Sequence, residues 1–426
     1  MMGAVSAHNL FQEDKAHGHG SYDAHRNPAK KMKVAVAGLG TGAVAVVRAM
    51  ESAPNLELVA AADIRPRALT AFQQRFGGRA YDSVEKLCDD PDVEVVWIST
   101  PNQFHCEHTL IAARGGKSVV VEKPMAMSLE EADLMVEAAE KHKVKLLCGH
   151  TASLMAANRR MRQVVASGEL GKICAINVWS YSDWMFRPRM PQEVDLATGG
   201  GVPYRQGPHQ IDTVRLLGGG LVRSVRAQTG QWFPARKVPG YYAAFLEFED
   251  GTPATAVHNG YGYFSTFEFV PWAGSRLNRG AEERRRALRA DPASAEREAA
   301  DKDEMRFGGS KEGGMEGGPQ EVRAPRTGFQ GDLGIVITSC QLGDIRQAPN
   351  GLWIYDDNGQ REVPVEGIHD ERMGELDEMY DAVQHNRPVA HDGRWGMATL
   401  EVVLAIMQSG RERREIIMTH QCPSYE

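Results

Sequence analysis

The stretch Val34-Ala35-Val36-Ala37-Gly38-Leu39-Gly40-Thr41-Gly42-Ala43 joins a short apolar run to a glycine-rich turn, and helical spacing of apolar residues continues to Ser52. In a strand–turn–helix of this kind, Gly38 permits the tight turn and Gly40 lets the backbone approach a pyrophosphate. Ala43 allows the helix to pack closely on the strand, and the amino terminus of the helix faces the phosphates. The residues from Gly38 to Ala43 therefore predict a dinucleotide-binding turn.

Asp63 ends the next apolar strand and is the expected ligand of the adenosine ribose. A carboxylate at this position accepts hydrogen bonds from the ribose hydroxyls, which favours NAD. Arg65 and Arg67 follow it, and their guanidinium groups would either begin a solvated helix or hold the 2′-phosphate of NADP. We expect NAD as the cofactor, with NADP as the alternative.

Between Lys33 and His150, apolar strands alternate with amphipathic helices. The expected strands are Val34–Ala37, Leu58–Ala62, Val93–Ser99, Ser118–Val121 and Lys145–Cys148, and the expected helices are Ala43–Ser52, Arg67–Phe76, Glu107–Ala113 and Leu129–His142. Strands that are apolar throughout and joined by helices indicate a parallel sheet covered on both faces. We expect a doubly wound Rossmann domain over residues 32–150, with its ligands at the carboxyl edge of the sheet.

A charged pair ends one of these strands, in Val119-Val120-Val121-Glu122-Lys123-Pro124. Desolvation penalises a charged ammonium, so a lysine at the mouth of a buried strand indicates chemistry, and we expect Lys123 to be catalytic. Thr100-Pro101-Asn102 follows the neighbouring strand, where an ordinary capped turn is the alternative interpretation. Besides the glycine turn and Asp63, the residues expected to border the cofactor are Thr100, Pro101, Asn102, His105, Glu122 and Lys123.

From Thr151 onward, strands with alternating apolar and polar residues dominate the chain. The expected strands are Ile173–Tyr181, Val222–Thr229, Ala243–Phe248, Ala254–Tyr261, Ile335–Ser339 and Leu352–Tyr355, with helices at Ala156–Ser167, near Gln210–Leu217, at Glu371–His385 and at Met397–Glu412. Such alternation is typical of an antiparallel sheet with one covered face. We therefore expect an α/β fold, in which the doubly wound parallel domain is followed by an α+β domain (residues 151–426) with a mainly antiparallel open sheet.

Two segments fall outside this pattern. Residues 274–330 combine mixed charge and glycine with few large apolar residues, which predicts a flexible insert with a short helix near Ala281–Arg289. A lid or an oligomer arm is the alternative for so long an insert. Residues 1–31 are polar and rich in histidine, and their composition predicts a disordered tail and no targeting segment.

The stretch Gly199-Gly200-Gly201-Val202-Pro203-Tyr204-Arg205-Gln206-Gly207-Pro208-His209-Gln210-Ile211-Asp212 is the most unusual of the second half. Its end predicts the start of a helix, on which His209 and Asp212 share a face. A histidine at a helix start usually packs or caps the helix. Beside a glycine-rich turn, an aspartate and Arg205, it is better suited to carry a proton, so His209 is the second candidate catalytic residue.

The glycine turn, Glu122-Lys123-Pro124 and the His209–Asp212 motif together resemble the glucose–fructose oxidoreductase/inositol dehydrogenase/MocA-like family, from about Met32 to Arg414. The resemblance implies an NAD(P)-dependent oxidoreductase in which Lys123 and His209 frame the reacting carbinol and Asp212 helps to orient the site. It also implies a homo-oligomer, a dimer or a tetramer, paired through the flat sheet of the second domain. Arg205 departs from the family pattern, which usually has an aspartate there.

Three arginines in the second half point to the charge of the substrate: Arg205 and the pair in Phe186-Arg187-Pro188-Arg189. Arginine is suited to bidentate recognition of carboxylates, so Arg205, Arg187 and Arg189, together with Asp212, are the candidate substrate-binding residues for an anionic ligand. Surface ion pairs with Glu193 or Asp195 are the alternative for Arg187 and Arg189.

The combination of these motifs resembles the branch of phthalate 4,5-cis-dihydrodiol dehydrogenases. That resemblance implies a carboxylated cyclic diol as substrate, oxidised to 4,5-dihydroxyphthalate in the phthalate case. A sugar or inositol dehydrogenase is the alternative within the family. A non-catalytic dinucleotide sensor is the alternative of another class, although a sensor needs neither Lys123 nor His209.

Composition limits the remaining possibilities. The chain has 426 residues and a formal net charge of −7, which leaves no basic excess for binding nucleic acid. Its six cysteines include no CxxC pair, as expected in a reducing compartment, and no apolar run reaches the roughly 20 residues of a membrane span. No histidine–carboxylate cluster has the spacing of metal ligands. We expect a cytoplasmic protein that acts on a small molecule, without metal, nucleic acid or membrane.

Overall fold

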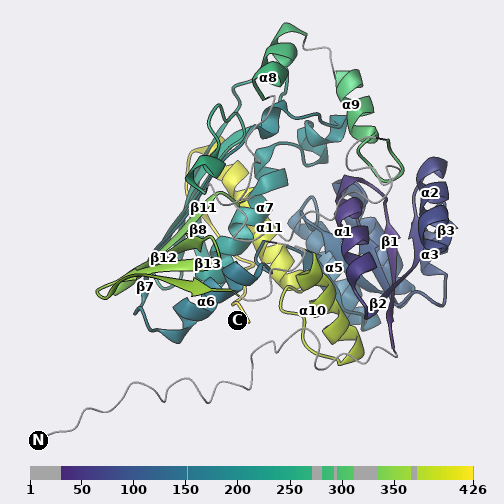
Figure 1. Cartoon of the computed structure of the whole chain (residues 1–426), viewed down its shortest axis with the longest axis horizontal. Helices are drawn as coiled ribbons and strands as arrows, with labels where there is room; N and C mark the ends of the chain where they lie inside the picture. Colours follow the sequence, from purple (N-terminus) through teal and green to yellow (C-terminus); the bar gives the residue numbers. More distant parts are fainter. Residues whose placement is uncertain are drawn as a thin grey trace, which may run out of the picture.

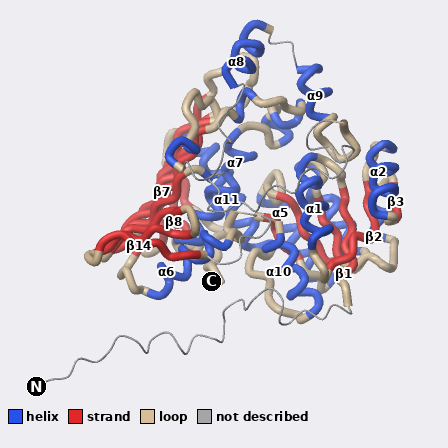
Figure 2. The backbone as a smooth tube through the Cα atoms, viewed as in Figure 1, coloured by secondary structure: helices blue, strands red, loops and turns tan. Residues whose placement is uncertain are grey.

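The computed structural model describes residues 30–150, 152–270, 281–291, 295–310, 333–365 and 372–425. Two sheets lie on opposite sides of the molecule, and helices fill the space between them (Figure 1, Figure 2). Nearly all of the predicted disordered tail lies outside the described residues. Within them, no helix combines the length and the apolar character that crossing a membrane requires.

The amino-terminal sheet is parallel throughout, in the strand order β3-β2-β1-β4-β5-β6. Its strands are β1 Met32–Ala37, β2 Leu56–Ala62, β3 Arg79–Tyr81, β4 Val95–Ile98, β5 Ser118–Glu122 and β6 Leu146–Gly149, and the helices along them are α1 Thr41–Ser52, α2 Pro66–Phe76, α3 Val84–Cys88, α4 His105–Arg114 and α5 Leu129–His142. This order is that of a doubly wound dinucleotide-binding domain, which confirms the predicted Rossmann fold. Both β3 and α3 were missed because they are too short to show a period.

Helices cover both faces of this sheet. Alternate residues of β1 pack to opposite sides, with Val34 and Val36 in one apolar cluster and Ala35 in the other. Helix α10 (Met373–Gln384) joins the first of these clusters through Leu376 and other buried residues. A helix near the end of the chain therefore packs on the first sheet, although its sequence position falls within the range predicted for the second domain.

The second sheet has the order β14-β13-β12-β11-β7-β10-β9-β8-β15. Its strands are β7 Ile173–Tyr181, β8 Val222–Gly230, β9 Tyr241–Phe248, β10 Pro253–Asn259, β11 Ile335–Cys340, β12 Gly343–Ala348, β13 Gly351–Asp356, β14 Gly359–Pro364 and β15 Ile416–Ile417. Among the described strands, neighbours in this sheet pair antiparallel except β7 with β10. The prediction of an α+β domain with a mainly antiparallel sheet is confirmed.

One face of the second sheet is covered by helices. Helices α7 (Val202–Leu217) and α11 (Gly393–Glu412) pack against it and against each other, and α6 (Ala156–Ser167) contacts α7. On strands β7 and β9, Trp179 and Phe245 are exposed between buried neighbours. Pairing of subunits through this sheet stays a prediction.

Helix α7 begins at Val202, well before the helix predicted near Gln210. The glycines and prolines of this stretch resemble helix breakers, but Gly201 caps the helix with a φ of 94° and Pro203 lies in the first turn, where a proline is tolerated. Pro208 lies inside the helix. Arg205 and His209 are therefore both helical and lie one turn apart, so they occupy the same face.

Parts of the predicted insert are ordered helices. The short helix expected near Ala281–Arg289 is present as α8 (Ala281–Ala290), and α9 (Ala295–Asp303) follows it without having been predicted. Figure 1 shows α9 standing above the first sheet, on the side of α2. Residues 271–280, 292–294 and 311–332 lie outside the described residues.

Candidate active site

The glycine turn between β1 and α1 leaves room only for hydrogen at its first position. Gly38 has a φ of 88°, and a Cβ there would lie 2.8 Å from Ser99 O and from Thr100 N. Helix α1 starts without a side-chain cap and without an acidic residue in its first turn, so its first N–H groups remain available to an anion. This turn fits the pyrophosphate of a dinucleotide.

Asp63 connects the glycine turn to the end of β2. Its carboxylate accepts hydrogen bonds from Leu39 N at 2.7 Å, Arg65 N at 2.8 Å, Arg65 Nε at 3.0 Å and Arg65 Nη2 at 3.1 Å. Arg65 Nη2 also donates to Leu39 O at 2.6 Å. A carboxylate has about four lone-pair sites, so ribose hydroxyls must displace one of these donors to bind Asp63.

The loop after β4 lies beside the turn after β5. His105 contacts Thr100 O and Pro124 O, each at 2.9 Å, and a neutral imidazole donates to one of the two at a time. Pro101 leads into a short helical turn at Asn102–Phe104. His105 is buried and both its ring nitrogens meet protein atoms, so it positions the two loops, whereas its predicted contact with the cofactor stays a prediction.

Lys123 extends from the end of β5 to helix α7. Its Nζ donates to Arg205 O at 3.0 Å, and the peptide bond to Pro124 is cis. Burial lowers the pKa of Lys123 to about 8; Glu122 opposes this shift, and the charges of Arg205 and Arg372 add to it. Glu122 itself pairs with Arg372 at 2.8 Å. At pH 7 roughly a tenth of Lys123 is therefore a neutral amine, and this fraction rises with pH, as expected of a general base.

His209 lies one turn along α7 from Arg205. Burial, and next the charge of Lys123, hold the pKa of His209 well below its usual value, so its imidazole is neutral. Lys123 Nζ contacts Arg205 O, one turn before His209 on α7, so the amine and the imidazole lie near each other. The two predicted catalytic residues are thus close enough to perturb each other, one from each domain.

Asp212 is fully buried, and its Oδ1 accepts a hydrogen bond from Trp395 Nε1 of α11 at 2.5 Å. Its charge raises the pKa of His150, although burial outweighs it and lowers that pKa to about 4. His150 was missed by the sequence analysis. It directly follows β6, and the rule that ligands bind at the carboxyl ends of parallel strands would have found it.

The predicted arginines differ in what they contact. Arg205 Nη1 donates to Asn102 Oδ1 at 3.2 Å, and its Nε is buried with no partner among the described residues. Arg187 pairs with Asp183 at 2.7 Å. Arg189 is buried, and its guanidinium is bound to Trp184 O at 3.0 Å and to Glu193 at 3.3 Å.

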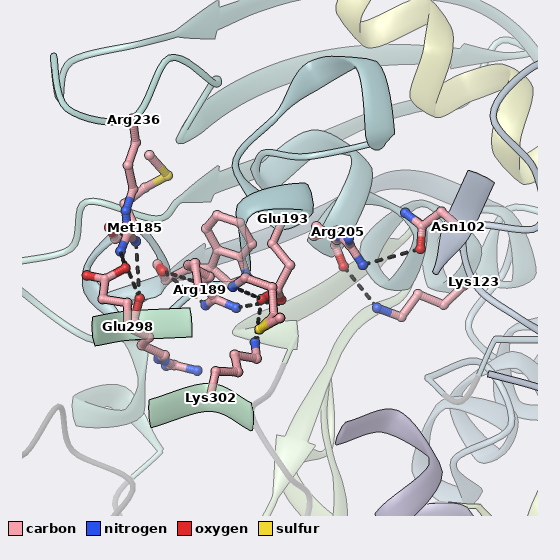
Figure 3. A network of polar contacts seen from close by, with 12 residues as sticks. Asn102, Lys123, Met185, Arg189, Glu193, Arg205, Arg236, Glu298 and Lys302 are labelled. Carbon is pink, nitrogen blue, oxygen red and sulfur yellow. Dashed lines mark hydrogen bonds and ion pairs between the residues drawn. The ribbon is translucent and has the colours of Figure 1, made fainter. Parts of the chain in front are cut away.

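Helix α9 adds a cation that the sequence analysis did not single out. Lys302 Nζ lies 2.7 Å from Glu193, and Figure 3 shows Lys302 and Arg189 reaching Glu193 while Lys123 and Asn102 reach Arg205. Burial alone would raise the pKa of Glu193, but Arg189 and Lys302 lower it to about 2. Burial and the charge of Arg189 lower the pKa of Lys302 to about 8. Among the residues of these contacts, four are cations (Arg189, Lys302, Lys123 and Arg205) and one is a carboxylate (Glu193).

Comparison with known proteins finds matches over most of the chain. Residues 32–150 match the model of the oxidoreductase family with an NAD-binding Rossmann fold, and residues 158–269 match the GFO/IDH/MocA C-terminal domain. A 1-carboxy-3-chloro-3,4-dihydroxycyclohexa-1,5-diene dehydrogenase of Comamonas testosteroni is 33% identical over 89% of this chain and 95% of the relative. The chain belongs to the Gfo/Idh/MocA oxidoreductase family.

Other known proteins resemble the chain in different degrees. A solved protein of Bordetella bronchiseptica RB50, assigned as a dehydrogenase, superposes with a TM-score of 0.81 at 32% identity, over 91% of this chain and 100% of that one. The myo-inositol 2-dehydrogenase of Thermotoga maritima is 26% identical over 46% of this chain and 58% of its own length. The protein is an NAD(P)-dependent oxidoreductase with an NAD-binding Rossmann domain, as predicted, and its preference for NAD over NADP stays a prediction.

Proposed function

We propose that this enzyme oxidises a carbinol of a carboxylated cyclic diol, with phthalate 4,5-cis-dihydrodiol as a candidate substrate. The observation on which the proposal rests is the charge of the site, where Arg205 on α7 and Lys302 on α9 accompany the catalytic candidate Lys123. A buried donor without a partner costs about 1–3 kcal/mol. A carboxylate that accepts from Arg205 Nε would remove that cost and balance the local charge.

The name of the Comamonas relative supports this substrate class, because it describes a cyclohexadiene with one carboxylate and two hydroxyls. An aspartate in place of Arg205 would repel such a carboxylate, whereas a guanidinium binds it with paired hydrogen bonds. Arg187 and Arg189 are engaged with Asp183 and Glu193, so the proposal assigns recognition of the carboxylate to Arg205.

In the proposed reaction, the neutral amine of Lys123 accepts the proton of the substrate hydroxyl. The C–H bond on the same carbon breaks with its electron pair, and the carbinol becomes a ketone. Bound NAD+ supplies the acceptor for that hydride. For a dihydrodiol, the ketone then tautomerises to a catechol, a step that needs no group of the protein. Arg205 O, which accepts from Lys123 Nζ at 3.0 Å, holds the amine in place for the transfer.

His209 has a supporting part in this reaction. Its imidazole is neutral because its pKa is held far below the usual value, so it can hydrogen-bond the reacting hydroxyl without adding a second positive charge. Asp212 anchors α7 to α11 through Trp395 and so orients the turn of helix that presents His209.

The test is a substrate panel with the Arg205→Ala variant. Purified enzyme and NAD+ are assayed by NADH absorbance against the cis-dihydrodiols of phthalate and benzoate, the neutral cis-dihydrodiol of benzene, and myo-inositol. We expect turnover of the carboxylated diols, with a KM that rises roughly 10- to 100-fold in Arg205→Ala, from the 1.5–3 kcal/mol of a charged hydrogen bond. The neutral diol should change less than about threefold.

Arg223→Ala is the matched control, since Arg223 forms an exposed ion pair with Glu247 on the second sheet, at 2.9 Å. Equal losses on charged and neutral diols would contradict the role of Arg205. Turnover of myo-inositol in preference to every diol would favour the polyol alternative, which the inositol dehydrogenase among the relatives keeps open.

A further inference from the structure

We propose that Asp303 and Glu304, at the end of helix α9, make this enzyme select NAD over NADP. The inference depends on the dinucleotide chemistry proposed above, but not on the identity of the diol. It concerns the adenosine end of the site, where Asp63 lies beside the glycine turn. In dinucleotide-binding folds, a carboxylate at this position binds the ribose hydroxyls of NAD, and an arginine nearby binds the 2′-phosphate of NADP.

The segment after α9 is anchored on the Rossmann domain. Phe307 is only 1% exposed, and its ring lies 6.2 Å from that of Phe76 at the end of α2. The backbone at Gly308 also lies close to α2, because a Cβ there would be 3.3 Å from the Cα of Ala68. These contacts hold residues 303–308 beside the start of α2, where Arg67 lies.

The other part of α9 is anchored on the second domain. Glu298 pairs with Arg236, and Lys302 pairs with Glu193 at 2.7 Å. Helix α9 therefore connects the two domains, and the residues at its end have little freedom to move away from the adenosine site. A fixed position matters here, because a carboxylate that can rotate into solvent repels an anion only weakly.

Both arginines that would hold a 2′-phosphate face carboxylates from this segment. Arg65 Nη1 lies 3.8 Å from Asp303 Oδ1, and Arg67 Nη1 lies 3.1 Å from Glu304 Oε1. Glu304 is held by Ser310, whose backbone N and Oγ donate to Oε2 at 2.9 and 2.8 Å. Hydrogen bonds from Ser310, and next from Arg67, lower the pKa of Glu304 to about 2, so it is charged at all working pH values.

The formal charges at this end of the site balance. Three guanidinium groups face three carboxylates, in the set Asp63, Arg65, Arg67, Asp303, Glu304 and Arg306. A 2′-phosphate adds about two negative charges, and it would have to take guanidinium N–H groups that already bind Asp63, Leu39 O and Glu304. The hydroxyl of NAD adds no charge, so NAD is the favoured ligand.

The experiment measures binding directly, so no substrate is needed. Dissociation constants for NAD+ and NADP+ are determined by calorimetry on the full chain, for the wild type and for Asp303→Asn/Glu304→Gln. The double variant leaves an excess of two positive charges with little change in shape. We expect the wild type to bind NAD+ more tightly. In the variant, NADP+ affinity should rise on the order of tenfold, with NAD+ affinity within about twofold.

Glu51→Gln is the matched control. Glu51 accepts hydrogen bonds from Arg75 Nε at 2.8 Å and from Arg75 Nη2 at 2.9 Å, at the opposite end of α2. This variant should leave both dissociation constants unchanged. A thermal melt checks that each variant folds. If the double variant does not fold, Glu304→Gln alone replaces it, and NADP+ affinity should then rise by about half as much in free energy. A wild-type preference for NADP+, or an unchanged ratio of the two constants in the folded variants, would overturn the proposal. If NAD+ selection holds while no carboxylated diol is oxidised, the proposed substrate fails and this inference stands.

Discussion

Replacing Lys123 with methionine removes an ammonium and keeps a long, flexible side chain of similar size. In the wild type, the amine lies between β5 and α7, with Arg205 O as its acceptor at 3.0 Å. If Lys123 is the general base, turnover should fall by roughly 10²–10⁴ in Lys123→Met, while the dissociation constant of NAD+ stays within about threefold. The glycine turn and Asp63, which we assign to the dinucleotide, are untouched by the change.

The same substitution should raise the stability of the protein. The fall in the pKa of Lys123 from 10.5 to about 8 corresponds to about 3 kcal/mol that burial of the charged form costs the folded state. The variant also loses the charged hydrogen bond to Arg205 O, which destabilises it by about 1.5–3 kcal/mol. The free energy of unfolding should therefore rise by a net amount on the order of 1 kcal/mol at pH 7.

The gain should depend on pH in a defined direction. The pKa of Lys123 is lower in the folded state than in the unfolded state. Below about pH 8 the lysine is protonated in both states, so the folded wild type bears the whole cost of burying the charge. The cost fades as the pH rises from about 8 to 10.5, because the unfolded lysine then also loses its proton. Thermal melts of both proteins at pH 7 and pH 10 should therefore show the advantage of the variant shrinking.

Two results would refute this reasoning. Activity within a few-fold of the wild type would show that Lys123 is not the base. A variant that is inactive but also clearly less stable at pH 7 would mean that the lysine serves the structure, and that the loss of activity follows from misfolding. Loss of activity with unchanged or higher stability is the outcome expected of a buried catalytic amine.

The remaining predictions concern protonation, the glycine turn and the docking of α9. At saturating NAD+, kcat/KM for oxidation should rise with pH to a plateau with an apparent pKa near 8, from Lys123; a flat profile between pH 6 and 9 would contradict this. Gly38→Ala forces a Cβ to 2.8 Å from Ser99 O and should weaken NAD+ binding at least tenfold and lower Tm, as calorimetry and a thermal melt can check. Phe307→Ala should cost about 3 kcal/mol of packing, visible as faster hydrogen exchange in residues 295–310; exchange equal to the wild type would show that the ring does not anchor the segment.

Periodicity was sufficient for most of the fold. Apart from β3 and α3, the strands and helices from β1 to β6 were predicted to within a few residues, because buried strands and amphipathic helices repeat apolar residues at characteristic spacings. Helix α7 shows the limit of that approach. Its glycines and prolines lower the local preference for a helix, and it forms from Val202 because packing against α11 and the second sheet outweighs this preference.

By itself, the sequence determined the features that depend on neighbours along the chain, namely the strand–turn–helix at Gly38, the carboxylate at Asp63 and the lysine at the end of β5. The tertiary structure decided which distant groups meet. Lys123 and Arg205 are 82 residues apart, Lys302 and Glu193 are 109 apart, and Arg67 and Glu304 are 237 apart. Contacts over such separations leave no periodic trace, since they depend on how whole domains pack, and so the role of α9 became visible only in three dimensions.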